Sequence, residues 1–114
     1  MTAADALGRV AAAFPHAQEE GYAMQELLRV ENLVRTEVLG EAPLGALEPD
    51  SALSVSGAYE GLYEHFVAAM LAGAAGETAR CNNDMALYSA LYDGFARARR
   101  REAAPVKDTR VRFG

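Results

Sequence analysis

The sequence lacks tryptophan and holds only one cysteine and two histidines among its 114 residues. The lone Cys81 excludes an intramolecular disulfide, and therefore a small disulfide-stapled scaffold. His16 and His65 have no second His or Cys at a metal-ligand spacing, and neither Glu60 nor Glu64 stands three residues before His65, as a di-iron bundle requires. Phosphate loops and G-x-S-x-G elbows are also missing. We therefore expect no metal, no cofactor and no catalytic constellation.

Two groups of reactive side chains still need an interpretation. Cys81 and His65 fall on two adjacent predicted helices, so a thiolate–imidazole pair is conceivable. A small thiol buried between helices is the plainer interpretation, because free cysteine is among the most buried residue types. Glu60 and Glu64 share one helical face, where such acids repel each other slightly and usually form a solvated surface. A small enzyme that uses Cys81 or Glu64 with His65 is the third and lowest-ranked hypothesis.

Long apolar runs and basic residues are both scarce. Glu, Gly and Arg break the apolar runs short of a membrane span, and the N-terminus lacks the basic region of a secretory signal, so we expect a soluble cytoplasmic protein. Residues 97–114 hold seven of the 11 Lys/Arg and two of the 16 Asp/Glu, so they carry +5 and the first 96 residues carry −10. This dipole allows the tail of one copy to lie on the body of another. Nucleic acid and a membrane surface are the alternatives.

Alanine and periodic apolar residues, in contrast, are abundant and favour helix in a chain of one-domain length. The first predicted helix covers Thr2 to Phe14, where Thr2 and Asp5 form a capping pair and Pro15 ends the helix. A second helix is predicted from about Glu20 to Leu39 with an apolar stripe along one face.

Two features of the second helix lead to further predictions. Glu31 and Arg35 stand four residues apart, acid before base, and are predicted to pair at the surface. Gly40 suits the C-terminal cap. The next residues, Glu41 to Gly57, break the periodicity with two prolines and two glycines and predict a long loop, of a kind that is often functional or ordered by a partner.

A helical hairpin is predicted after this loop. One helix starts near Ala58, a turn falls at Gly73 and Gly76, and a fourth helix runs from about Glu77 to Arg101. The polar run Cys-Asn-Asn-Asp at 81–84 leaves open a helix break there, although we favour one continuous helix. Aromatic residues at helical spacing are expected to form the core between these helices, with most tyrosine hydroxyls reaching solvent. They are Tyr59, Tyr63, Phe66, Tyr88, Tyr92 and Phe95.

The predicted fold class is therefore all-α. Residues 1–103 form a small bundle of about four helices with a long loop between the second and third helices, and residues 104–114 form an extended basic C-terminal tail. The tail could form a strand or dock on a neighbour. Arginine clusters neutralise phosphates, but this one lacks interleaved aromatics and follows an acidic body, so protein contact is favoured over DNA. The candidate interaction residues are Arg97, Arg99, Arg100, Arg101, Lys107, Arg110 and Arg112.

Between Tyr59 and Arg101 the chain resembles the small head–tail connector (adaptor) proteins of tailed bacteriophages and prophages. The resemblance rests on the aromatic-rich opening Y-E-G-L-Y-E-H-F and on an N-N-x-M-A-x-aromatic core followed by A-x-Y-x-x-F/Y-A. The tryptophans frequent in that family are missing, and Ser56-Gly57 stands where the family often has a proline. The matching core positions are Asn82, Asn83, Met85, Ala86, Tyr88, Ala90, Tyr92, Phe95 and Ala96.

The resemblance implies an all-helical structural subunit, not an enzyme and without a cofactor. Such subunits form a ring below the portal, usually twelve-fold in the virion, which extends the DNA channel and docks neck or tail proteins. The implied partners are further copies of the chain, the portal protein and neck or tail completion proteins, with DNA only as passing cargo and no membrane. The implied location is the head–tail junction of the virion, and the bacterial cytoplasm during assembly. The alternative is a host helical interaction or regulatory module whose basic tail binds an acidic partner or DNA.

Overall fold

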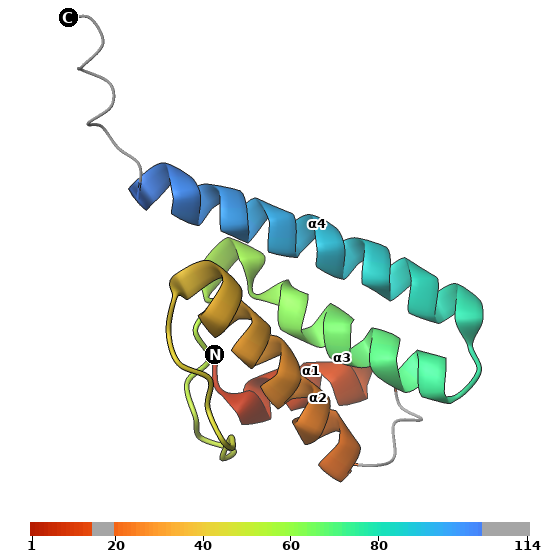
Figure 1. Ribbon diagram of the computed structural model, residues 1–114. Coiled ribbons are helices and arrows are strands. Elements are labelled where there is room, and N and C mark those ends of the chain that lie inside the picture. The colour runs from red at the N-terminus through yellow and green to blue at the C-terminus, as the bar shows by residue number, and fades with distance from the viewer. Residues whose placement is uncertain (15–19, 104–114) are drawn as a thin grey trace, which may run out of the picture.

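Figure 1 shows a computed structural model of the chain as a bundle of helices arranged around α3. The structure describes residues 1–14 and 20–103, so the predicted tail, residues 104–114, lies outside the described residues. The four described helices are α1 (Ala3–Ala13), α2 (Glu20–Leu33), α3 (Gly61–Ala74) and α4 (Thr78–Ala103), with a π-helical turn η1 (Val34–Leu39) and a 3-10 turn η2 (Gly57–Tyr59). These residues contain no β-strand, and the all-α prediction is confirmed.

The N-terminus of α1 satisfies its backbone donors through a capping box and a neighbouring loop. The Thr2 hydroxyl accepts from the Asp5 N–H at 3.2 Å, and the Asp5 carboxylate accepts from the Thr2 N–H at 3.0 Å, as the sequence predicts. The N–H groups of Ala3 and Ala4 donate to backbone carbonyls of residues 51 and 49, both at 2.9 Å. The first turn of α1 therefore fastens a loop that lies about forty-five residues later in the chain.

Helix α3 is the central element of the bundle. It packs against α1 and α2 on one side and against α4 on the other (Figure 1). A helix covered on several sides is apolar around most of its circumference, and α3 accordingly consists largely of apolar residues. Its buried residues are Leu62, Tyr63, Phe66, Val67, Ala68, Ala69, Leu71 and Ala72.

Helix α4 runs antiparallel to α3 and is continuous through the polar run at 81–84, so the predicted single helix is confirmed. An aromatic seam joins the two helices. Phe66 meets Tyr88 edge-to-face at 5.0 Å between ring centroids, and Tyr59 meets Phe95 at 6.2 Å. Because Tyr59 precedes the first residue of α3, the turns of α4 after Phe95 extend beyond α3 and reach η1 and the loop.

The segment between η1 and η2 is held by side chains of the chain itself. The Asn32 side chain donates to the Leu44 carbonyl at 3.0 Å and accepts from the Leu44 N–H at 2.7 Å. Arg35 donates through Nε to the Ala42 carbonyl at 2.8 Å. Leu47, Leu53 and Val55 are buried in the core. All of these anchors lie within the described chain.

Candidate interaction site at the end of α4

Four of the seven predicted site residues lie together on the last turns of α4. Arg97, Arg99, Arg100 and Arg101 are all exposed, and the last two occupy the final helical turn, where the helix dipole favours cations. Arg99 contacts Glu102 at 3.4 Å, a pair exposed on both sides. Lys107, Arg110 and Arg112 lie outside the described residues.

The four arginines that precede this cluster are all engaged within the chain. Each one ties two neighbouring segments together or covers an aromatic ring. Arg29, for example, contacts Glu26 at 2.9 Å and lies over the Phe66 ring at 5.7 Å. The others are Arg9 with Glu60 and Glu64, Arg35 with Glu41 and the Ala42 carbonyl, and Arg80 with the Ala13 carbonyl and the Phe14 ring. Among the described residues, the exposed arginines are therefore grouped most densely at the end of α4, where four of them lie within five positions.

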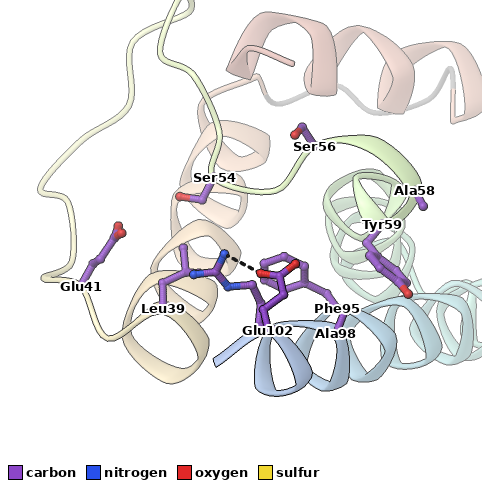
Figure 2. A pocket seen from close by; sticks show the side chains of 10 residues that line it. Leu39, Glu41, Ser54, Ser56, Ala58, Tyr59, Phe95, Ala98 and Glu102 are labelled. Atoms are coloured by element: carbon purple, nitrogen blue, oxygen red, sulfur yellow. Dashed lines mark hydrogen bonds and ion pairs between the residues drawn. The ribbon is translucent and has the colours of Figure 1, made fainter. Parts of the chain in front are cut away.

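An open groove of about 600 Å³ lies beside this cluster (Figure 2). Three separate parts of the chain form it: the end of η1 with Glu41, the segment from Ser54 to Tyr59, and α4 from Phe95 to Glu102. Aliphatic and aromatic side chains contribute apolar surface, and carboxylates, hydroxyls and Arg99 contribute polar surface. The groove is lined by Leu39, Glu41, Ser54, Ser56, Ala58, Tyr59, Phe95, Ala98, Arg99 and Glu102.

The buried carboxylate of Glu31 binds Ser54, one of the residues that line the groove. Glu31 is completely buried and accepts hydrogen bonds from the Tyr63 hydroxyl and the Ser54 hydroxyl, both at 2.6 Å. The Ser54 N–H also donates to it at 3.2 Å, and the Val55 N–H donates to the Tyr63 oxygen at 2.9 Å. Burial, reinforced by the Glu31 hydrogen bond, raises the pKa of Tyr63 well above its usual range.

This network corrects two predictions from the sequence. Glu31 does not form a surface pair with Arg35, because Glu31 faces the core and Arg35 contacts Glu41 at 3.3 Å. The Tyr63 hydroxyl does not reach solvent, because it is used between Glu31 and Val55. A signal for the burial was available in the sequence, since Glu31 lies four residues after Leu27, in one apolar stripe with Val30 and Val34.

The conceivable Cys81–His65 pair is not formed. The Nδ1 atom of His65 lies 3.0 Å from the Asp84 carboxylate, and Asp84 is buried. The Cys81 sulfur lies 3.3 Å from the position that a Cβ on Gly73 would take, two helical turns along α3 from His65. Cys81 is packed against the core between the helices, as expected, but it is only half-buried and not fully buried.

Residues 1–14 and 20–103 hold no group of three or more His, Cys, Asp or Glu side chains that could bind a metal ion. None of the helices in this part of the chain has the length and apolarity needed to cross a membrane. Against known proteins, no family model, no curated sequence and no solved structure matches this chain.

Proposed function

We propose that the chain is a structural subunit of a bacteriophage head–tail connector, which assembles into a ring below the portal and has no catalytic activity. The observation that carries the proposal is the exposed arginine cluster at the end of α4, on a body whose other arginines are engaged internally. This end follows directly on the α3–α4 hairpin, whose residues carry the resemblance to connector proteins. The fold class agrees with that of the family.

Ring formation requires two different surfaces that fit each other, since only a heterologous contact can close into a ring. The arginine cluster supplies one such surface. An acidic surface of opposite sign lies where the loop meets the start of α1, because backbone hydrogen bonds bring residues 49 and 51 to Ala4 and Ala3. Its exposed carboxylates belong to Asp5, Glu48 and Asp50. The loop tip and the end of α4 lie at different places on the molecule (Figure 1).

The charge distribution also suits a DNA channel. The first 96 residues carry −10, so the body repels the phosphate backbone and does not hold DNA during its passage. Contacts between exposed charges of opposite sign orient the subunits and accelerate their encounter more than they add affinity. Apolar contacts, including those of the groove, would then supply stability to the ring.

Electron microscopy of the purified protein, alone and with portal particles, tests the proposal. We expect rings, or subunits bound to the portal, for the natural sequence. The double variant Arg97→Glu/Arg101→Glu should lose them while its circular dichroism stays unchanged, because neither side chain contributes to the core. Adding Glu48→Arg and Asp50→Arg should restore assembly if these surfaces meet. A protein that stays monomeric and never binds portal particles would exclude the proposal.

The same arginine cluster also supports the alternative, a host module that binds an acidic partner or DNA. Phosphate binding by n arginines lowers the logarithm of the binding constant by about 0.9n per decade of salt for duplex DNA. A titration of labelled duplex DNA at several salt concentrations separates the two functions. Tight, salt-dependent binding without ring formation would favour the alternative, and genes for regulators beside this one would agree with it.

A further inference from the structure

The groove beside the end of α4 has the properties of a site for an extended peptide. Its volume of about 600 Å³ lies within the range of ordinary ligand sites, and it is partly open to solvent. Figure 2 shows the side chains that line it. Its apolar surface comes from Leu39, Ala58, Tyr59, Phe95 and Ala98. Peptide-binding grooves combine such apolar surface, which receives alternate side chains, with polar groups along the rim.

The rim of the groove carries two carboxylates and one guanidinium, that of Arg99, so its net charge is negative. Glu41 and Glu102 line the groove with side chains that are 50% and 67% exposed. Glu41 contacts Arg35 at 3.3 Å and Glu102 contacts Arg99 at 3.4 Å. The Glu102–Arg99 pair is exposed on both sides and contributes only about 0–1 kcal/mol, so Glu102 stays available to an incoming cation. The C-terminal ends of η1 and α4 also meet at the groove, and helix C-termini carry partial negative charge.

One segment of this chain has the complementary sequence. Arg110-Val111-Arg112-Phe113 alternates basic and apolar residues, so an extended backbone places Val111 and Phe113 on one face and the arginines on the other. Val111 and Phe113 are suited to contact the rings of Tyr59 and Phe95 in the groove. The two arginines are suited to contact the carboxylates of Glu41 and Glu102. The other alternation of arginine with apolar residues, Ala96-Arg97-Ala98-Arg99, lies within α4 and is helical.

We propose that residues 110–113 of one copy bind in this groove of a second copy. The inference rests on the self-association in the proposed function and adds a second contact between copies to that of the arginine cluster with the acidic surface. A second copy is favoured over the same chain because α4 leads away from the bundle as it passes Glu102 (Figure 1).

Disulfide trapping in the full-length protein tests this. In a Cys81→Ser background, one protein carries Ala58→Cys in the groove and another carries Val111→Cys in the tail. We expect a mixture of the two to form a covalent heterodimer on mild oxidation, since a disulfide needs Cα atoms within about 7 Å. Ala86→Cys replaces Ala58→Cys in the control, because Ala86 is equally exposed but lies on the outer face of α4. Glu41→Lys/Glu102→Lys should lower the yield several-fold.

Each outcome decides the matter. Heterodimer formed no faster than with the Ala86→Cys control overturns the inference. In a single chain with both Ala58→Cys and Val111→Cys, a disulfide confined to the monomer also overturns it, because the chain then fills its own groove. Rings seen by microscopy without trapping would refute the groove assignment alone. A monomeric protein without trapping would refute the proposed function as well.

Discussion

The Tyr63 hydroxyl donates a hydrogen bond of 2.6 Å to the Glu31 carboxylate inside the bundle, across 32 residues of sequence. Both side chains are fully buried, and the same hydroxyl accepts from the Val55 N–H. A buried carboxylate is costly unless donors surround it, and here Tyr63 and Ser54 supply them. The pair therefore joins α2, α3 and the 40–56 segment into one unit.

Replacing this tyrosine should be costly. Tyr63→Phe removes one donor from Glu31 and the acceptor of the Val55 N–H, and leaving buried polar groups without partners costs about 1–3 kcal/mol each. We expect a lower urea midpoint with an unchanged m-value. Tyr22→Phe is the matched control, since Tyr22 is only partly buried, and should change stability by less than about 0.5 kcal/mol. Equal stability of the two variants would contradict the assigned role of Tyr63.

Alkaline pH should weaken the fold through its tyrosines. Burial, assisted by the nearby Glu37 and Asp93 carboxylates, raises the pKa of Tyr88 to about 12 from its usual value of 10.0. The pKa of Tyr63 is raised further, by burial and by Glu31. Between these pH values the folded protein keeps protons that the unfolded chain loses. The stabilisation that comes from the raised pKa of Tyr88 is therefore complete below pH 10 and is lost as the pH rises through 12.

Urea titrations at a series of pH values check this prediction. We expect a steady fall of the midpoint above pH 10, with tyrosinate absorbance rising as the protein unfolds. Tyr88→Phe removes one of the retained protons, so its decline with pH should be shallower than that of the natural sequence. A decline of the same steepness would show that Tyr88 does not contribute.

The helices were predictable because their signals are local. Apolar periodicity, the Thr2–Asp5 capping box and the Gly40 cap depend on residues within one or two turns of each other. The predicted ends agree within a few residues with Ala3–Ala13 and with Thr78–Ala103. Antiparallel packing of the last two helices follows from the short turn between them, together with aromatic stripes on both.

The buried network and the groove could not be predicted in the same way. Glu31 and Ser54 are 23 residues apart, and the groove combines η1, the loop and α4. Such contacts depend on how a long irregular segment folds back, for which no periodic pattern exists. Glutamate is also rarely buried. The i, i+4 spacing of Glu31 and Arg35 therefore favoured a surface ion pair, although Glu31 lies in an apolar stripe. The arginine cluster was found because it is contiguous.

Asn32 should control the order of the segment after Gly40. Asn32→Ala removes both hydrogen bonds to the Leu44 backbone, with an expected loss of about 1–3 kcal/mol. Amide hydrogen exchange at Leu44 should accelerate, because the segment can open in the variant without first breaking these two hydrogen bonds. Thr36→Val serves as the control, since its hydroxyl bonds only to the Asn32 carbonyl in the helix. Unchanged exchange at Leu44 in Asn32→Ala would count against the anchor.

Two helical glycines should respond oppositely to alanine. A Cβ at Gly8 meets open space, so Gly8→Ala should stabilise the protein by about 1 kcal/mol through helix propensity. A Cβ at Gly94 would lie 2.7 Å from the Tyr59 ring, so Gly94→Ala displaces that ring from Phe95 and should destabilise. Thermal unfolding measures both. In a Tyr59→Ala background Gly94→Ala should no longer destabilise the protein. If it still lowers the unfolding temperature there, the alanine does not clash with the Tyr59 ring.

Arg9 should contribute to stability through its ion pairs with Glu60 and Glu64. Its guanidinium lies 3.2 Å from Glu60 and 3.4 Å from Glu64, so it joins α1 to the start of α3 and offsets the repulsion between two carboxylates one turn apart. Since Arg9 is 46% exposed, Arg9→Gln should lower the urea midpoint of unfolding only slightly at low salt, and by less at high salt. In a Glu60→Gln/Glu64→Gln background the same change should cost nothing, because no charge is left to offset. A loss that persists there, or that ignores salt, would mean that Arg9 acts by packing its aliphatic stem and not by its charge.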